Sequence, residues 1–89
     1  MKAIVTVLGN DQVGIIAKVS NKLAEYNVNI IDITQTIIQG KFTMTMAVDT
    51  EKMNSSFVEF AQKMAELGKE MGLQIRVQRE EIFDAMYTV

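Results

Sequence analysis

Two short polar segments contain the residues of this chain that could bind a charged small molecule. The first is residues 9–14, with the sequence GNDQVG, and the second is centred on Asn29. Asp11 can pair with an ammonium group through its carboxylate, and Asn29 can both donate and accept a hydrogen bond. Gly14 has no Cβ, so a ligand or a neighbouring backbone can approach it closely. These groups complement the two charges of an amino-acid zwitterion.

A predicted helix after the first segment strengthens this interpretation. Apolar residues recur at helical spacing from Ile15 to Tyr26. The free amide groups and positive dipole end of such a helix favour a carboxylate, and Asp11 is the expected N-cap. The predicted pocket, at the junction of a dimer, consists of Asn10, Asp11, Gly14, Ile15, Asn29 and Ile30.

Three of these residues also have a purely structural explanation. Asp11 could serve only as a helix cap, and Gly14 could serve close packing of the helix on a strand. Asn29 could be a turn residue at the entrance to a strand. The binding hypothesis therefore depends on the combination and its spacing.

Composition excludes most other chemistry. The chain has 89 residues, no cysteine and no histidine, so thiolate nucleophiles, imidazole bases and Cys/His zinc sites are not available. No arrangement of the remaining residues suggests catalysis, a metal site or a cofactor. The net charge of −2 argues against nucleic-acid binding. Short apolar stretches and the lack of a secretory segment predict a cytoplasmic protein that does not enter a membrane.

The remaining elements are read from periodicity and turn residues. Residues 3–8, 30–39, 42–49 and 73–78 are predicted strands, and a turn is expected at residues 40–41. A second helix follows Ser56, which has capping-box spacing with Glu59, and Gly72 is a predicted left-handed C-cap. Four methionines, Met44, Met46, Met64 and Met71, are interpreted as core-filling residues.

The element order β-α-β-β-α-β predicts a ferredoxin-like α+β sandwich. Right-handed crossovers place both helices on one face of a four-stranded antiparallel sheet, with the second strand at an edge. The predicted domain covers residues 1–79. Residues 80–89 are expected to form a short amphipathic helical tail, in which Ile82, Phe83 and Met86 share one face.

Two segments of the sequence resemble a known family, the ACT domain. They are residues 9–16, GNDQVGII, and residues 27–30, NVNI, and the resemblance extends over residues 3–79. It is greatest to short stand-alone bacterial ACT proteins and to repressor-type regulators of glycine cleavage. The sequence departs from the family at Gln12 and Val13, where Arg-Pro is common. It also departs at Gly9, where some serine-binding members have histidine.

The resemblance implies a regulatory protein that binds a small molecule, an amino acid first of all. It implies a homodimer joined through the edges of the second strands, which signals in trans to an enzyme or regulator protein. The alternative function is a ligand-free module for protein–protein interaction and assembly. A catalytic function ranks third among the hypotheses, because no arrangement of residues in the sequence indicates catalysis.

Overall fold

The computed structural model describes residues 1–87, with only the backbone described for Tyr87; residues 88–89 of the predicted tail lie outside the described part. Seven elements follow one another along the chain. They are β1 (Lys2–Asn10), α1 (Ile15–Glu25), β2 (Asn29–Ile38), β3 (Lys41–Asp49), α2 (Phe57–Met71), β4 (Gln74–Arg79) and α3 (Glu80–Tyr87).

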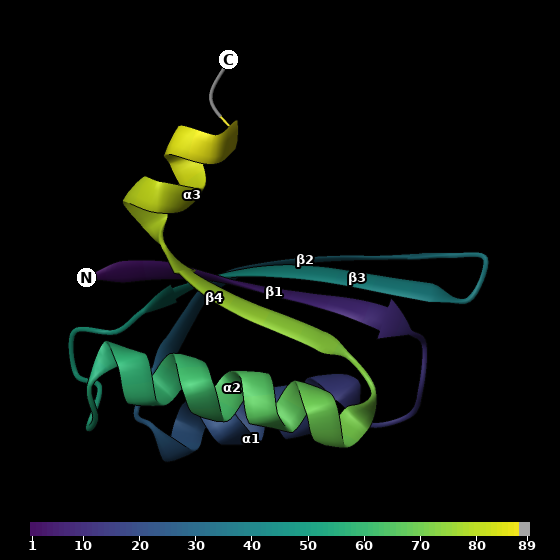
Figure 1. The fold of residues 1–89 in the computed structure, drawn as a ribbon, viewed down its shortest axis with the longest axis horizontal. Coiled ribbons are helices and arrows are strands. Elements are labelled where there is room, and N and C mark those ends of the chain that lie inside the picture. Colours follow the sequence, from purple (N-terminus) through teal and green to yellow (C-terminus); the bar gives the residue numbers. More distant parts are fainter. Residues whose placement is uncertain (88–89) are drawn as a thin grey trace.

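The strands form one antiparallel sheet in the order β2-β3-β1-β4. Figure 1 shows α1 and α2 together on one face of this sheet, and α3 rising from the other face. The predicted ferredoxin-like fold is confirmed, and so is the position of the second strand at an edge. The helical prediction for the tail is also confirmed for the residues that α3 contains.

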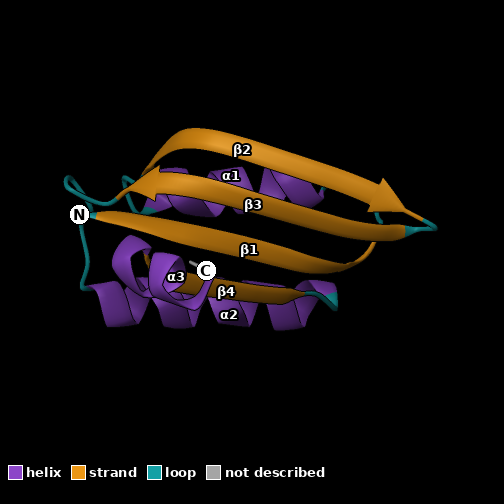
Figure 2. Cartoon of the chain, turned by 90° about the horizontal axis from the view of Figure 1, so that it is seen from above, coloured by secondary structure: helices purple, strands orange, loops and turns teal. Residues whose placement is uncertain are grey.

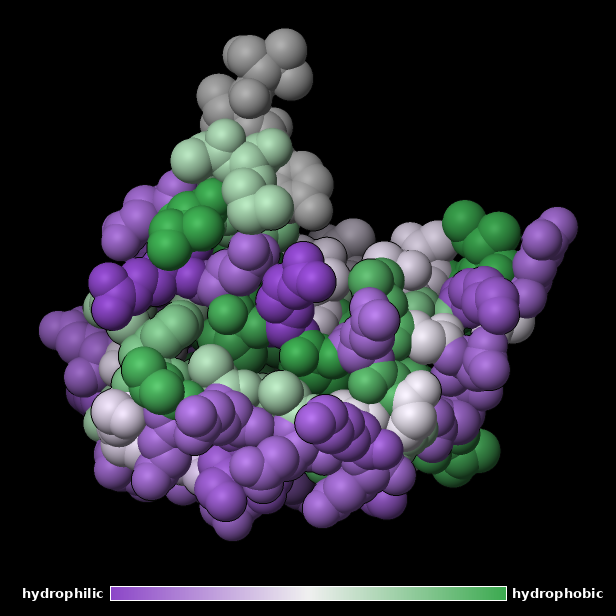
Figure 3. All heavy atoms as spheres, viewed as in Figure 1, coloured by the Kyte–Doolittle hydropathy of each residue, from purple (hydrophilic) through white to green (hydrophobic). Residues whose placement is uncertain are grey.

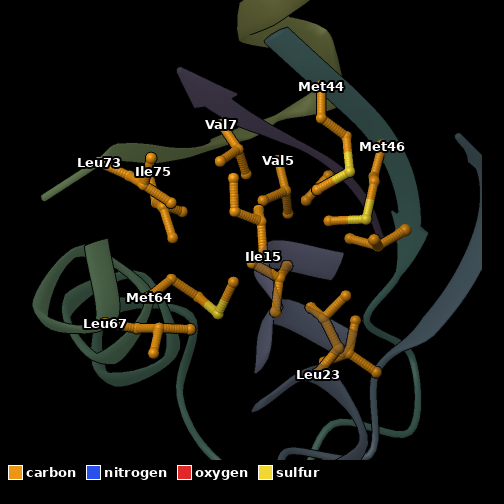
Figure 4. Close-up of a cluster of buried hydrophobic side chains, with 14 of the residues drawn as sticks. Val5, Val7, Ile15, Leu23, Met44, Met46, Met64, Leu67, Leu73 and Ile75 are labelled. Carbon is orange, nitrogen blue, oxygen red and sulfur yellow. The ribbon is translucent and has the colours of Figure 1, made fainter. Parts of the chain in front are cut away.

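The core lies between the sheet and the two helices (Figure 4). Met44, Met46 and Met64 are completely buried there, together with Phe60 and Leu23. Thioethers are flexible and adapt to irregular gaps. The interpretation of these methionines as core-filling residues is therefore confirmed, and Met71 packs against the same cluster while partly buried.

Both predicted caps of α2 are present. The Glu59 backbone N–H donates to Ser56 Oγ at 3.1 Å, so the serine satisfies one of the free donors of the first turn. Gly72 ends the helix with φ 70°, a left-handed conformation that glycine adopts at low cost.

The hairpin between β2 and β3 differs from the prediction in the position of its turn. The turn consists of Gln39 and Gly40, with φ of 51° and 77°, and Lys41 already belongs to β3. Positive φ at both turn residues gives the twist that antiparallel strands prefer. In β2, a register shift between Ile30 and Asp32 leaves Ile31 in a bulge, so Ile30 and not Ile31 is in phase with Ile33.

α1 lies beneath β2 and β3 and α2 lies beneath β4 (Figure 2), but the cover over β2 is incomplete. All ten residues of β2 are exposed, whereas every second residue of the neighbouring β3 from Phe42 to Val48 is buried. An exposed edge strand of this length presents unpaired backbone groups and an apolar surface at once.

On the other side of the fold, α2 approaches β4 through Gly68. A Cβ on this glycine would lie 2.9 Å from the Leu73 carbonyl oxygen and 3.1 Å from the Ile75 backbone nitrogen. Because both neighbours are backbone atoms, they cannot rotate away. The absence of a side chain at this position therefore allows α2 to lie close to β4.

We expect Gly68→Ala to lower the free energy of unfolding by about 1–3 kcal/mol, because overpacking forces the backbone apart. Alanine normally stabilises a helix interior relative to glycine by about 1 kcal/mol, so the sign of the effect is diagnostic. Urea unfolding measures it. Gln62→Ala, at an exposed position on the same helix, should stay within about 0.5 kcal/mol of the wild type. A stabilised Gly68→Ala variant would contradict the close approach.

Candidate functional site

The first polar segment forms a corner between the end of β1 and the start of α1. The Asp11 backbone N–H donates to the Gly40 carbonyl oxygen at 2.8 Å. Lys41 Nζ donates to Asn10 Oδ1 at 3.0 Å. These two hydrogen bonds attach the corner to the β2–β3 turn. The end of β1, the end of β2 and the start of β3 therefore lie close together here.

The N-terminus of α1 at this corner has no side-chain cap among the described residues. The helix begins at Ile15, its N-cap is Gly14, and no acidic residue lies in its first turn. The predicted role of Asp11 as the N-cap is therefore wrong. The left-handed conformation of Gly14, with φ 90°, turns the chain into the helix three residues after Asp11. The free amide groups of the first turn keep their capacity to bind an anion.

A hollow of about 280 Å³ lies at this corner. Asp11, Gly14 and Ile15 line it from one side, and Gln35, Ile37 and Phe42 line it from the β2–β3 hairpin. A Cβ on Gly14 would meet nothing within 4 Å. The glycine is thus required by its backbone conformation, and the space beside it is open. Close helix–strand packing does not explain it.

The hollow combines charge recognition with an apolar surface. Asp11 provides an exposed carboxylate, and the end of α1 provides free N–H donors and the positive end of the helix dipole. Ile15 and Phe42 are 2% and 3% exposed and lie at the floor of the hollow, while Ile16 and Ile37 are 41% and 52% exposed and provide apolar surface at its rim. The arrangement can hold a small molecule that has an ammonium group, a carboxylate and an apolar part.

The six predicted site residues fall into two groups. Asp11, Gly14 and Ile15 line the hollow, and Asn10 precedes them at the end of β1. Asn29 and Ile30 lie at the opposite end of the sheet, because Asn29 pairs with Asp49 whereas Asn10 pairs with Lys41. Strand geometry puts about 25 Å between these ends. One chain alone therefore does not bring Asn29 and Asp11 together.

Sequence reasoning missed the contribution of the hairpin to the hollow. Ile37 pairs with Phe42, and Phe42 pairs with Gly9, so the register carries these side chains to the corner. Counting back from the hairpin turn would have found them. Gln12 also lines the hollow, and its side-chain Nε2 donates to the Met71 carbonyl oxygen at 2.8 Å, which ties the corner to the end of α2.

Other kinds of site have little support in the described residues. Residues 1–87 contain no cluster of three or more Asp, Glu, His or Cys side chains able to hold a metal ion. No described helix is both long and apolar enough to cross a membrane.

Comparison with known proteins gives the family. A model of the ACT domain matches residues 2–78 of this chain. The chain belongs to the ACT domain family. ACT domains are regulatory ligand-binding domains, so the comparison points to regulation in preference to catalysis.

The similar proteins are close to this chain in length as well as in sequence. A UPF0237 protein of Listeria monocytogenes is 49% identical over 98% of both chains. One from Methanosarcina mazei is 45% identical over 97% of this chain and 94% of its own. A solved ACT domain protein from Streptococcus pneumoniae is 40% identical, with a TM-score of 0.82 over 98% of both chains.

A more distant neighbour shares the fold alone. A putative glycine cleavage system transcriptional repressor is 21% identical, with a TM-score of 0.71. The match covers 86% of this chain and 44% of the repressor's length.

We expect Gly14→Ala to lower the free energy of unfolding by about 1–2 kcal/mol, because an L side chain strains the left-handed conformation. Gly14→Asn should cost less, since asparagine tolerates this conformation better than alanine. Thermal or urea unfolding of both variants measures the difference. Equal losses in the two variants would show that steric crowding, and not backbone conformation, requires glycine here.

Proposed function

We propose that this chain is a homodimeric sensor that binds an amino acid at the corner between β1 and α1. The supporting observation is the hollow of about 280 Å³ at that corner, where the uncapped end of α1 lies beside the carboxylate of Asp11. ACT domains are regulatory ligand-binding domains, and the proposal names the ligand class and the place where it binds.

The polar part of the proposed ligand follows from charge. The α-carboxylate binds the free N–H groups at the start of α1, because hydrogen bonds to an ionised acceptor are stronger than neutral ones. The α-ammonium group pairs with Asp11. Neither interaction needs a histidine or a cation, both of which the first polar segment lacks.

The apolar part of the ligand follows from the walls. Ile16 and Ile37 offer exposed hydrocarbon surface, and Gln35 adds a side-chain amide. A small aliphatic side chain gains free energy by contact with such a wall. We therefore infer an amino acid whose side chain is smaller than the hollow and predominantly apolar.

Dimerisation through β2 completes the site. Antiparallel pairing of β2 with β2 of a second copy extends the sheet and covers unpaired backbone groups. It also buries Ile33 and Ile37, which are 42% and 52% exposed in the single chain.

The same pairing brings the two groups of predicted residues together. Asn29 begins β2 and Ile38 ends it. A two-fold axis at the middle of the strand therefore places Asn29 and Ile30 of one copy beside Ile38 of the other, next to the hollow. In this arrangement the amide of Asn29 reaches a ligand held by Asp11 and α1 of the second copy.

The proposed sensor acts on a protein in trans. Ligand binding at a subunit junction changes the relative stability of dimer arrangements, and a partner responds only if it has different affinities for them. The partner class is a regulated enzyme or a regulator protein.

Titration with the common amino acids tests the ligand class. We expect saturable heat with at least one small apolar amino acid. Asp11→Ala should weaken its binding about tenfold, ~1.4 kcal/mol, because the ammonium group loses its counter-charge. Glu70→Ala removes an exposed carboxylate on α2 and serves as the matched control. Absence of heat with all amino acids at millimolar concentration contradicts the proposal.

Mixing two weakened variants tests the composite site. Asp11→Ala and Asn29→Ala should each weaken binding about tenfold when alone. A mixed dimer contains one site with both substitutions and one intact site, so about a quarter of the sites in an equal mixture should regain the wild-type affinity. No recovery after verified subunit exchange would place both residues in the same chain's site, or outside it.

The alternative, a ligand-free assembly module, is favoured by the exposed apolar surface of β2. Native mass spectrometry separates the two functions. A bound small molecule in freshly purified protein supports the sensor, and a stable heteromeric complex without one supports the assembly module.

A further inference from the structure

The C-terminal helix α3 stands on the face of the sheet that α1 and α2 do not cover (Figures 1 and 2). It contacts β1 and β4, and Gln78 Nε2 donates to Met86 Sδ at 3.4 Å. Ile82 and Met86 nevertheless remain 50% and 59% exposed. A helix of this length is not stable by itself in water, so its apolar side needs a surface to pack on.

A second hollow, of about 330 Å³, lies along β4 at the edge of the sheet. Thr6, Leu8, Gln74 and Arg76 line it from the open face, whereas Ala65 and Lys69 of α2 line it from the helix side. Leu8 is 40% exposed. Figure 3, which looks onto the β4 edge of the sheet, shows apolar side chains between polar ones below the projecting α3.

The charges of the helix and the hollow are complementary. The described residues of α3 include three acids, Glu80, Glu81 and Asp84, and no basic residue. The part of the hollow that opens on this face contains Arg76 and no acidic residue, and Lys69 of α2 adds a second cation at the β4 edge. An acidic helix with an apolar side therefore matches a cationic hollow with an apolar floor, and both belong to the same chain.

We propose that two copies pack with their open sheet faces together, each inserting α3 into the β4 hollow of the other. The two-fold axis lies parallel to the sheets and perpendicular to the strands. Such an axis exchanges the two ends of each strand. In each copy, α3 stands at the Gln78 end of β4. After the rotation, it faces the opposite end of the second copy's sheet, where Leu8 and Gln74 lie. Ile82 and Met86 then pack on Leu8.

The rest of the open face suits this contact. Register places Thr34, Thr45 and Thr6 side by side across three strands, and uncharged hydroxyls cost less to bury than charges. Asp32 and Lys41 lie toward opposite ends of the neighbouring strands β2 and β3 on this face. The axis brings Asp32 of one copy near Lys41 of the other.

This interface is independent of the β2 pairing proposed above, because it uses another surface. The β2 pairing has its two-fold axis perpendicular to the sheet, and the open-face contact has its axis parallel to the sheet. Two perpendicular axes that intersect give a closed tetramer. With both interfaces formed, the chain of 10.0 kDa assembles to about 40 kDa.

Light scattering of the full-length chain with an Ile82→Glu substitution tests the open-face interface. We expect the molar mass to halve, because a carboxylate replaces the apolar contact at a position already half exposed in the single chain. Val58→Glu is the matched control, since Val58 is 65% exposed on α2, and it should keep the wild-type mass. Circular dichroism verifies that both variants are folded. An unchanged mass in Ile82→Glu, or a monomeric wild type, overturns the proposal.

Cross-linking gives a second, positive readout. The chain has no cysteine, so single cysteines can be introduced without side reactions. Chains with Met86→Cys mixed with chains with Leu8→Cys should form a mixed disulfide under mild oxidation. Val58→Cys mixed with Leu8→Cys gives the background. A yield no higher than this background overturns the proposal, while loss of β2 pairing or of amino-acid binding leaves the expected cross-link in place.

Discussion

The structure depends on one geometric constraint: the two helices cover one edge of the four-stranded sheet only in part. α1 and α2 bury the helix-side residues of β3, β1 and β4, and Gly68 lets α2 lie close enough to β4 to do so. The fourth strand, β2, contacts α1 but stays exposed along its whole length, although its sequence is rich in isoleucine. An apolar edge strand is an aggregation hazard unless something pairs with it. The incomplete cover over β2 therefore explains three features. β2 exposes an apolar surface, a hollow forms at its end, and a second copy can pair with it.

The candidate site depends on a smaller conformational detail within this frame. Gly14 adopts a left-handed conformation and ends the loop without a side-chain cap, so α1 begins with free donors that face a hollow. If Asp11 had capped the helix, its carboxylate would have been used within the chain and the donors would have been satisfied. Because the helix starts three residues later, carboxylate and donors remain available on the same rim. Asp11 could either cap the helix or bind a ligand. Because the left-handed conformation of Gly14 starts the helix later, Asp11 does not cap it, and its carboxylate is available to a ligand.

Sequence patterns predicted the parts of the fold that local chemistry determines. Ser56, Gly72 and the buried methionines behave as their types and spacing indicate. The start of α1, the bulge at Ile31 and the turn at Gln39-Gly40 were not predictable in the same way, since positive φ and register shifts leave little trace in hydrophobic periodicity. For the site, spacing identified Asp11, Gly14 and Ile15. It did not reveal that Asn29 lies at the far end of the sheet, nor that Phe42 and Ile37 form the wall, because both facts arise from strand pairing.

The two sides of the sheet allow binding and assembly to operate separately. The hollow at the corner is built by α1 and by helix-side residues such as Phe42, whereas α3 and its complementary hollow involve the open-face residues Leu8 and Arg76. A ligand in the corner hollow does not compete sterically with α3 of a second copy docked in the β4 hollow. β1 connects the two places directly, because Leu8 lines the second hollow and the strand ends at Asn10 beside the corner. An assembly held through the open faces would keep the ligand sites at the β2 junctions, and it would present α1 and α2 outward to a regulated protein.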